Sequence, residues 1–282
     1  MKDPTCYQRT KLKELKRLLS RDPIDWDHFL ELDKELSAVP SPSFNCSFSW
    51  IMSKYPPKYI VRAVLSRYHH YLFSDKTSCN QCLQSALSYS SVDTISFIAF
   101  REPQILGQTL NDSTGDIPLH RAGNTEIASI LVRAYPDGVG IKNNDGNLPI
   151  HLAIIHYKSP DQIRLLIEEG KRQKIGSGDG GIHVKNKKGE TPFSILCKQV
   201  ATGIDMAYIT FPLFRSDLRL WENLNTLLIA YSTNHNGPPT HRKFRILHSL
   251  ISANCPQQAI LMAQIIDPNQ VKEIDETGRY PL

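Results

Sequence analysis

The chain has 282 residues, of which 40% are hydrophobic and 22% charged, with 33 Lys and Arg against 28 Asp and Glu. This balance is typical of a folded protein and argues against wholesale disorder. No run approaches the roughly 18 apolar residues of a membrane-spanning helix. The basic helix expected over 11–19 lacks the apolar core of a signal peptide. The six cysteines are scattered, so we expect reduced thiols in a cytoplasmic or nuclear protein.

The first part of the chain predicts helices without a turn motif. Residues 1–43 are expected to form an N-terminal helical cap, followed by a linker at Ser41-Pro-Ser43. Apolar residues at helical spacing then predict two helix pairs. The four helices are expected over 48–54, 59–68, 82–90 and 92–101. The packing face of the cap is expected to be Trp26, Phe29, Leu30 and Leu32.

From residue 112 a pattern [DN]-x-x-G-x-x-P-[LIF] occurs four times, beginning at Asp112, Asn143, Asn186 and Asp275. The Asx side chain folds back onto the chain to start a turn, and the Gly supplies the positive φ that the turn requires. Pro is favoured at the first position of a helix, where a missing N–H has no cost. The pattern therefore predicts a turn followed by a helix that starts at Pro118, Pro149, Pro192 and Pro281. The apolar residue after each Pro is expected to face a neighbouring unit.

A second helix is expected in each of these units. Thr125 is predicted to cap one, and Ser159 another, in a capping box with Gln162. Gly170 is the expected end of that second helix. An insertion is expected over 201–215, after which Ser216 should cap a longer helix. A unit without a recognisable turn is indicated by helices over 244–252 and 257–266.

These elements define a cap followed by an array over 44–282. The repeats are expected at about 44–79, 80–111, 112–142, 143–185, 186–236 and 237–274, with a truncated repeat from 275. Such arrays act by offering a long surface to partners. A truncated last unit should leave Ile260, Leu261 and Ile265 exposed, so we expect self-association through them.

Four segments resemble ankyrin repeats. They are Pro118-Leu119-His120-Arg121-Ala122, Pro149-Ile150-His151-Leu152-Ala153, Thr191-Pro192-Phe193 and Pro281-Leu282. The resemblance implies an all-α, ankyrin-type solenoid of stacked antiparallel helix pairs with short fingers. It also implies a non-enzymatic scaffold for protein–protein interactions.

The chain departs from the family pattern at the residue before Pro. Ile117, Leu148 and Tyr280 stand where the family has a capping Thr, and only Thr191 keeps it. Ser194 replaces the family His in that copy. We expect the lost caps to cost about 1 kcal/mol each.

The most basic part of the chain is 171–188, which carries a net charge of +5, equal to that of the whole protein. In an ankyrin reading it is an enlarged finger that projects toward an acidic partner. The alternatives are a solvated insertion without a ligand, or a site for nucleic acid or another phosphate-rich ligand. Base stacking would need interleaved aromatic residues, which this segment lacks. A further alternative is a targeting module of a larger enzyme or receptor that continues beyond residue 282.

The predicted partner-binding residues lie on the fingers and in the basic segment. They are Ser113, Thr114, Asp116, Asn144, Asp145, Asn147, Lys171, Arg172, Lys174, Lys185, Lys187, Lys188 and Glu190. No catalytic constellation, metal site or cofactor is expected. Gly176–Gly181 lacks the ending of a phosphate-binding loop and is interpreted as a flexible hinge. Cys79 and Cys82 have the spacing of half a zinc site without a second half, which favours core packing.

Overall fold

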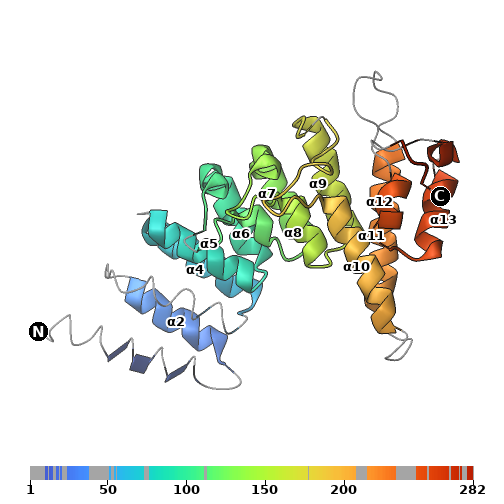
Figure 1. The fold of residues 1–282 in the computed structure, drawn as a ribbon. Helices are drawn as coiled ribbons and strands as arrows, with labels where there is room; N and C mark the ends of the chain where they lie inside the picture. The colour runs from blue at the N-terminus through green and yellow to red at the C-terminus, as the bar shows by residue number, and fades with distance from the viewer. Residues whose placement is uncertain are drawn as a thin grey trace, which may run out of the picture. The chain divides into compact units, whose positions relative to one another are not determined.

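The computed structural model divides the chain into two compact units, Met1–Asn111 and Asp112–Leu282 (Figure 1). The boundary falls between the expected repeats 80–111 and 112–142. The part of the chain that the structure describes is all-helical and contains no strand. The described residues are 10–11, 13–14, 17–18, 20, 24–37, 51, 54, 56–72, 76–110, 113–176, 178–207, 215–232, 246–252, 254–266, 268–272, 274 and 278–281. The predicted linker at 41–43 and the turn residues Asp112 and Asp275 lie outside them.

The first unit is a set of packed helices. They are α2 (Trp26–Ser37), α4 (Lys58–Leu72), α5 (Lys76–Ser88), α6 (Val92–Arg101) and the 3₁₀ helix η2 (Pro103–Gly107). Helix α4 contacts α2, α5 and α6, and α5 packs on α6. The helix predicted over 92–101 is confirmed at both ends. Helix α4 extends beyond both predicted limits, whereas α5 begins six residues earlier than predicted and ends two residues earlier.

The core of this unit uses the predicted apolar positions. Phe29 and Leu32 of α2 are buried, and Trp26 packs edge-on against Phe29 with ring centroids 5.7 Å apart. Cys79 and Cys82 are buried thiols on α5, so they pack in the core as predicted. The helix predicted over 48–54 is described only at residues 51 and 54.

The second unit contains helices in pairs. They are η3 (Pro118–Arg121) with α7 (Thr125–Ala134), α8 (Pro149–Ile155) with α9 (Pro160–Arg172), α10 (Pro192–Ala207) with α11 (Arg215–Ser232), and α12 (Ile246–Ser252) with α13 (Gln257–Ile266). Two further 3₁₀ helices are η4 (Pro136–Gly140) and η6 (Pro268–Lys272). The helix predicted over 257–266 is confirmed at both ends.

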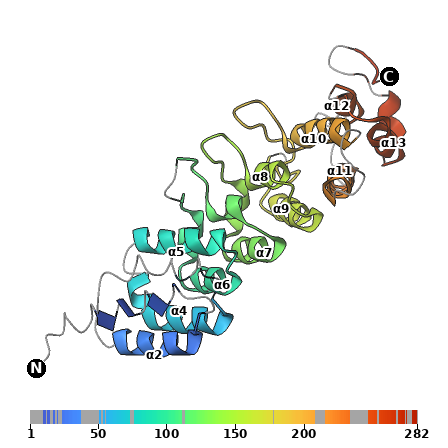
Figure 2. The same ribbon diagram turned by 90° about the horizontal axis from the view of Figure 1, so that it is seen from below.

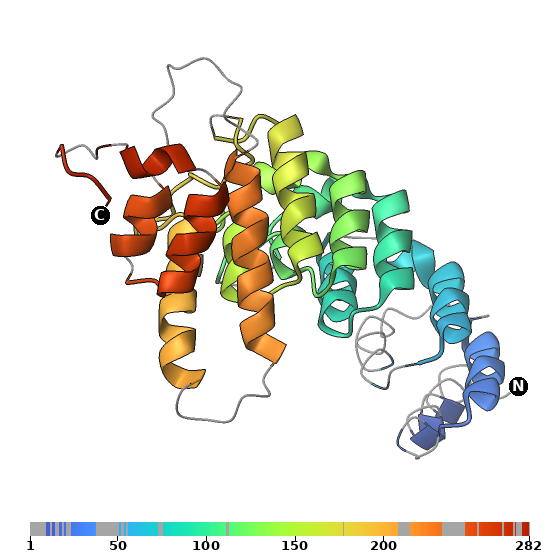
Figure 3. The same ribbon diagram turned by 90° about the vertical axis from the view of Figure 1, so that its right-hand side faces the viewer.

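The pairs lie in two rows. The first helices form one row in the order η3, α8, α10, α12, and each contacts the next (Figure 2). The second helices form the other row in the order α7, α9, α11, α13, and these stand side by side (Figure 3). Each first helix also contacts the second helix of its own pair. A unit built this way buries its apolar side chains between successive pairs.

Three of the four motif prolines begin helices as predicted, whereas Pro281 lies in no helix. Pro118, Pro149 and Pro192 are the first residues of η3, α8 and α10. The apolar residues that follow them, Leu119, Ile150 and Phe193, are all buried. The first of these helices is a single 3₁₀ turn, because Gly123 and the cap of α7 follow directly.

Two predicted caps differ from the structure. Asn124, not Thr125, caps α7, and its side-chain oxygen accepts a hydrogen bond from the Ile127 N–H at 2.9 Å. Ser159 caps α9 as predicted, through the Gln162 N–H at 3.3 Å. Gln162 does not complete a capping box, since its side-chain amide donates to the Ala122 carbonyl instead. The amide therefore joins two successive pairs.

Three other helix limits were predicted wrongly. Helix α9 continues through Gly170 to Arg172. The glycine is needed there for packing, because a Cβ on Gly170 would lie 2.8 Å from the carbonyl oxygen of Gly180. Helix α10 runs on to Ala207, into the expected insertion, and Ser216 lies inside α11 rather than before it.

Candidate partner-binding surface

The turns at 143–147 and 186–190 are fixed by the first residue of the motif. The side-chain oxygen of Asn143 accepts hydrogen bonds from the Asp145 and Asn147 N–H groups, at 3.0 and 2.9 Å. Asn186 does the same for Lys188 and Glu190, both at 2.9 Å. The motif glycines have the predicted positive φ, 76° at Gly146 and 77° at Gly189. Each turn is thus closed by its own Asx side chain, as the motif predicts.

Backbone hydrogen bonds join each turn to the next one. The Asn144 N–H donates to the Thr114 carbonyl at 3.0 Å, and the Lys187 N–H donates to the Asp145 carbonyl at 2.9 Å. The Asn144 side chain also donates to the Ser113 carbonyl at 2.9 Å. The three turns therefore form one connected edge of the second unit.

Histidines at the third position of the first helices form a further link. The Nδ1 atoms of His120 and His151 accept the Ile117 and Leu148 N–H groups, at 3.2 and 3.1 Å. Because Nδ1 accepts, Nε2 carries the proton and donates to a backbone carbonyl oxygen in or just before the next turn. Those acceptors are Asn147 for His120 and Val184 for His151. His248 donates in the same way to Arg279.

These contacts change the expected cost of the missing capping Thr. Ile117 and Leu148 have no side-chain acceptor. The backbone N–H groups of His120 and His151 instead donate to the carbonyl oxygens of Ile117 and Leu148, at 3.0 and 2.9 Å. The N–H groups that a Thr would cap are therefore satisfied by the tight first turn. Thr191 and Ser194 form the full reciprocal cap in the third copy, with N–O distances of 2.9 and 3.1 Å.

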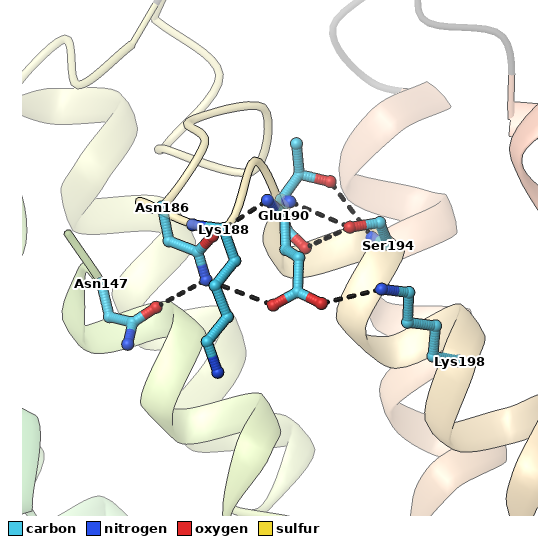
Figure 4. Close-up of polar contacts among 7 residues, drawn as sticks. Asn147, Asn186, Lys188, Glu190, Ser194 and Lys198 are labelled. Atoms are coloured by element: carbon cyan, nitrogen blue, oxygen red, sulfur yellow. Dashed lines mark hydrogen bonds and ion pairs between the residues drawn. The ribbon is translucent and has the colours of Figure 1, made fainter. Parts of the chain in front are cut away.

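A polar network lies beneath the second and third turns (Figure 4). The Asn186 side-chain amide donates to the Asn147 side-chain oxygen at 3.0 Å and to the Glu190 carboxylate at 3.4 Å. Lys198 of α10 forms an ion pair with the same carboxylate at 2.7 Å. The hydrogen bond from Lys198 lowers the pKa of Glu190 and outweighs the opposing effect of burial. Glu190 is therefore ionised and bound to its own protein.

The equivalent network under the first turn centres on Asp116. Its carboxylate accepts from the Asn143 side chain at 2.8 Å and from Arg121 at 3.2 Å. Burial alone would raise the pKa of Asp116. Hydrogen bonds from Asn143, Thr114 and Arg121 outweigh that effect, so this pKa lies below its ordinary value.

The structure divides the predicted finger residues into two groups. Asp116 and Asn147 are buried and bond to the protein itself, and half-buried Thr114 and Glu190 are held by Arg121 and Lys198. Their polar groups therefore stabilise the fold. The exposed turn tips consist of Ser113, Asn144, Asp145, Lys185, Lys187 and Lys188. We call these six residues the tip surface.

The basic segment 171–188 is not one projecting finger. Lys171 and Arg172 belong to the last turn of α9, where Lys171 donates to the Ala230 carbonyl at 3.4 Å. Arg172 pairs with Glu169 at 2.8 Å. Exposed Lys174 lies two residues beyond that helix and has a positive φ. Only Lys185, Lys187 and Lys188 reach the turn tips, so half of the expected positive charge lies elsewhere.

The glycine-rich stretch within this segment is packed, contrary to the predicted hinge. Gly180 lies against α9 so closely that a Cβ would be 2.5 Å from the Ile167 carbonyl oxygen. Ile182 is fully buried, and buried Asp179 accepts the Gly181 N–H at 2.8 Å. The glycines permit close approach of backbone to helix.

Sequence reasoning missed three basic residues beside the tip surface. Arg121 and Lys198 lie on the first-helix row and hold acidic turn residues. Exposed Lys142 donates to the Lys185 carbonyl at 3.3 Å and so adds positive charge next to the turns. The motif could have indicated these residues by their spacing. Arg121 and Lys198 stand three and six places after a motif proline, and Lys142 directly precedes a motif Asx.

Within the described residues, no group of three or more His, Cys, Asp and Glu side chains converges as metal ligands would. No described helix has the length and apolar character needed to cross a membrane. The chain matches no protein-family model and no curated protein.

Proposed function

We propose that the second unit is an ankyrin-type repeat array that acts as a non-enzymatic scaffold and binds a protein partner on the tip surface and the adjoining first helices. The observation that carries this proposal is the connected edge of turns. Backbone and side-chain hydrogen bonds hold the turns from below, while their tips stay exposed. A surface held in place before binding loses little conformational freedom on binding, which favours affinity.

The two helix rows and the repeated turns support the ankyrin assignment. Each turn is followed by a helix that starts at Pro, and each first helix contacts the next one in its row. His120 and His248 donate to the carbonyl two residues before the next motif proline, so the same connection recurs across the unit. These features agree with the resemblance seen in the motif residues.

The charge of the tip surface favours a partner with acidic side chains near its contact. Lys185, Lys187 and Lys188 are exposed within four residues, and Lys142 lies beside them. Asp145 gives the surface one opposite charge. A partner that places a basic residue at Asp145 and acidic residues at the lysines would fit both.

Affinity capture with matched variants tests this proposal. The full-length chain is immobilised and incubated with cell extract at low and at high salt, and bound proteins are quantified by mass spectrometry. The test variant is Asp145→Ala with Lys187→Ala and Lys188→Ala. The control is Arg133→Ala with Arg164→Ala, which removes two exposed charges from the second-helix row.

A true partner should be lost with the tip variant, kept with the control, and bound at least about tenfold less at high salt. A bound protein that ignores the tip variant, or binds equally at both salt concentrations, contradicts the proposed surface or its electrostatic steering.

The three exposed lysines at Lys185, Lys187 and Lys188 also suit a nucleic-acid backbone. The three turns at 113–116, 143–147 and 186–190 carry no aromatic residue on which bases could stack, so we favour protein. A gel shift with single-stranded and double-stranded oligonucleotides separates the two. A shift that is abolished by alanine at all three lysines would mean that the tip surface binds nucleic acid and not protein.

A further inference from the structure

Two thiols of the second unit lie against each other where α10 meets the loop between α12 and α13. The Cys255 thiol donates a hydrogen bond to the Cys197 carbonyl oxygen, with Sγ and O 3.3 Å apart. Hydrogen bonding between the two side chains also raises the pKa of Cys197 and lowers that of Cys255. Both are free and buried, but Cys255 keeps 7% of its surface exposed and Cys197 keeps none.

The local backbone fixes Cys255 in this position. The Asn254 residue before it has φ of 52°, and the Cys255 N–H donates to the Leu250 carbonyl at 2.9 Å, which closes the end of α12. The next residue, Pro256, precedes α13. The thiol is thereby held toward α10.

We propose that Cys255 and Cys197 form a reversible disulfide bond when the protein meets hydrogen peroxide, and that Cys255 reacts first. The Cys255 Sγ atom lies 3.3 Å from the main chain of Cys197, so the two residues are neighbours, and a disulfide requires the two side chains to close to bonding distance. The order follows from exposure, because Cys255 keeps some exposed surface and Cys197 keeps none.

The chemistry has two steps. The Cys255 thiolate attacks one peroxide oxygen, the O–O bond breaks, and Cys255 becomes a sulfenic acid while hydroxide leaves and is protonated to water. The Cys197 sulfur, deprotonated in this step, then attacks the sulfenic sulfur, the S–O bond breaks, and a second water leaves. Two thiols lose two electrons in total, and one peroxide gains them.

The electrostatics of the pair support this order. The hydrogen bond from Cys197 lowers the pKa of Cys255, and the thiolate is the reactive form. The same hydrogen bond, together with burial, raises the pKa of Cys197. Once Cys255 is a neutral sulfenic acid, its charge no longer opposes ionisation of Cys197, so the second step becomes easier after the first.

The disulfide bond would link two helix pairs covalently. Cys197 belongs to α10, and Cys255 follows α12, so the disulfide would close a loop of 58 residues between them. Closing such a loop restricts the unfolded chain, and we expect the melting temperature to rise by on the order of 5–10 °C.

Peptide mapping of the full-length chain tests the bond. The protein is treated with hydrogen peroxide, blocked with an alkylating agent and digested without reductant. We expect a linked peptide pair containing Cys197 and Cys255, a mass lower by two hydrogens, and reversal by dithiothreitol. The proposal would be overturned if both thiols remained free, and were therefore alkylated, under conditions that oxidise a short model thiol. A bond between other cysteines would also overturn it.

Two variants test the order of reaction. In Cys197→Ala the sulfenic acid on Cys255 has no partner and should be trapped by dimedone, whereas Cys255→Ala should leave Cys197 unlabelled. Dimedone on Cys197 but not on Cys255 would refute the order. Cys79→Ala is the matched control, because that buried thiol lies on another unit and should not affect the linked peptide.

Discussion

At the scale of single residues, the second unit depends on side chains that hold backbone groups. Asn143 and Asn186 close the turns, and His120 and His151 connect each first helix to the next turn. A buried residue that satisfies several backbone groups costs more to remove than its own volume suggests, because its partners are left unpaired.

Neighbouring asparagines give a direct test of this point. Asn143→Ala removes the acceptor for two N–H groups and the donor to Asp116, so we expect a loss of about 2–3 kcal/mol in the free energy of unfolding. Asn144→Ala removes an exposed side chain that bonds only the Ser113 carbonyl, and we expect about 0.5 kcal/mol. Urea unfolding monitored by circular dichroism measures both. Equal losses would contradict the structural role of Asn143.

The buried histidines should make the free energy of unfolding depend on pH. Burial lowers the pKa of His151 from 6.5 to about 4, and burial also lowers that of His120. The unfolded chain therefore binds a proton between about pH 6.5 and 4 that the folded chain does not, so folded stability falls as the pH drops through this window. For His151 the full effect is about 3 kcal/mol.

Denaturant unfolding at several pH values between 7 and 4 checks this expectation. His151→Gln should flatten the pH dependence, and His156→Gln, at the exposed residue directly after α8, is the matched control. A wild-type stability that stays constant from pH 6.5 to 4.5 would contradict the buried, neutral state of the histidines.

At the scale of elements, the segment between α9 and the third turn is a packed connection. Its glycines allow the chain to pass directly over α9, with Gly180 against Ile167 and Gly170. The same run could be interpreted from sequence as a hinge, because glycine permits both flexibility and close contact.

A pair of glycines separates these two roles. Gly178 and Gly180 both have positive φ, but a Cβ on Gly178 meets nothing within 4 Å. Gly178→Ala should cost about 1 kcal/mol of backbone strain. Gly180→Ala adds the clash with α9 and should cost at least about 2 kcal/mol more. Thermal unfolding of the two variants decides between packing and hinge, since a hinge predicts equal effects.

The turns and the helix starts were predictable because they depend on local chemistry. Asx, Gly and Pro each act within about five residues, so Asn143, Gly146 and Pro149 could be placed from the motif alone. The helix ends were less predictable, because Gly170 and the length of α10 depend on which other segment packs against them. The sequence also could not show that Asp116 and Asn147 are buried, since this depends on Asn143 and Asn186 from the next turn.

At the scale of the whole molecule, two compact units each carry their own core. The last α-helix described in the second unit is α13, on which Leu261 is 47% and Ile265 is 79% exposed. Large exposed apolar side chains on one helix favour association. Ile260, predicted with them, is half-buried.

We therefore expect self-association at high protein concentration. Leu261→Lys with Ile265→Lys should shift the protein toward monomer in sedimentation velocity, because both changes place charge on the apolar surface of α13. Gln264→Lys on the same helix adds charge without removing an apolar side chain and should have little effect. A wild-type protein that is monomeric throughout the concentration range would contradict this expectation.

The most direct test of the proposed function is photo-crosslinking from defined positions of the full-length chain. A photoreactive amino acid is placed at Lys187 on the tip surface or at Arg164 on the second-helix row, and crosslinked proteins are identified after irradiation in extract. We predict that one acidic protein crosslinks from position 187, is displaced by excess unmodified chain, and is absent from position 164. Crosslinking from position 164 alone, or nucleic acid as the competed ligand at position 187, would contradict a protein scaffold that binds through its turns.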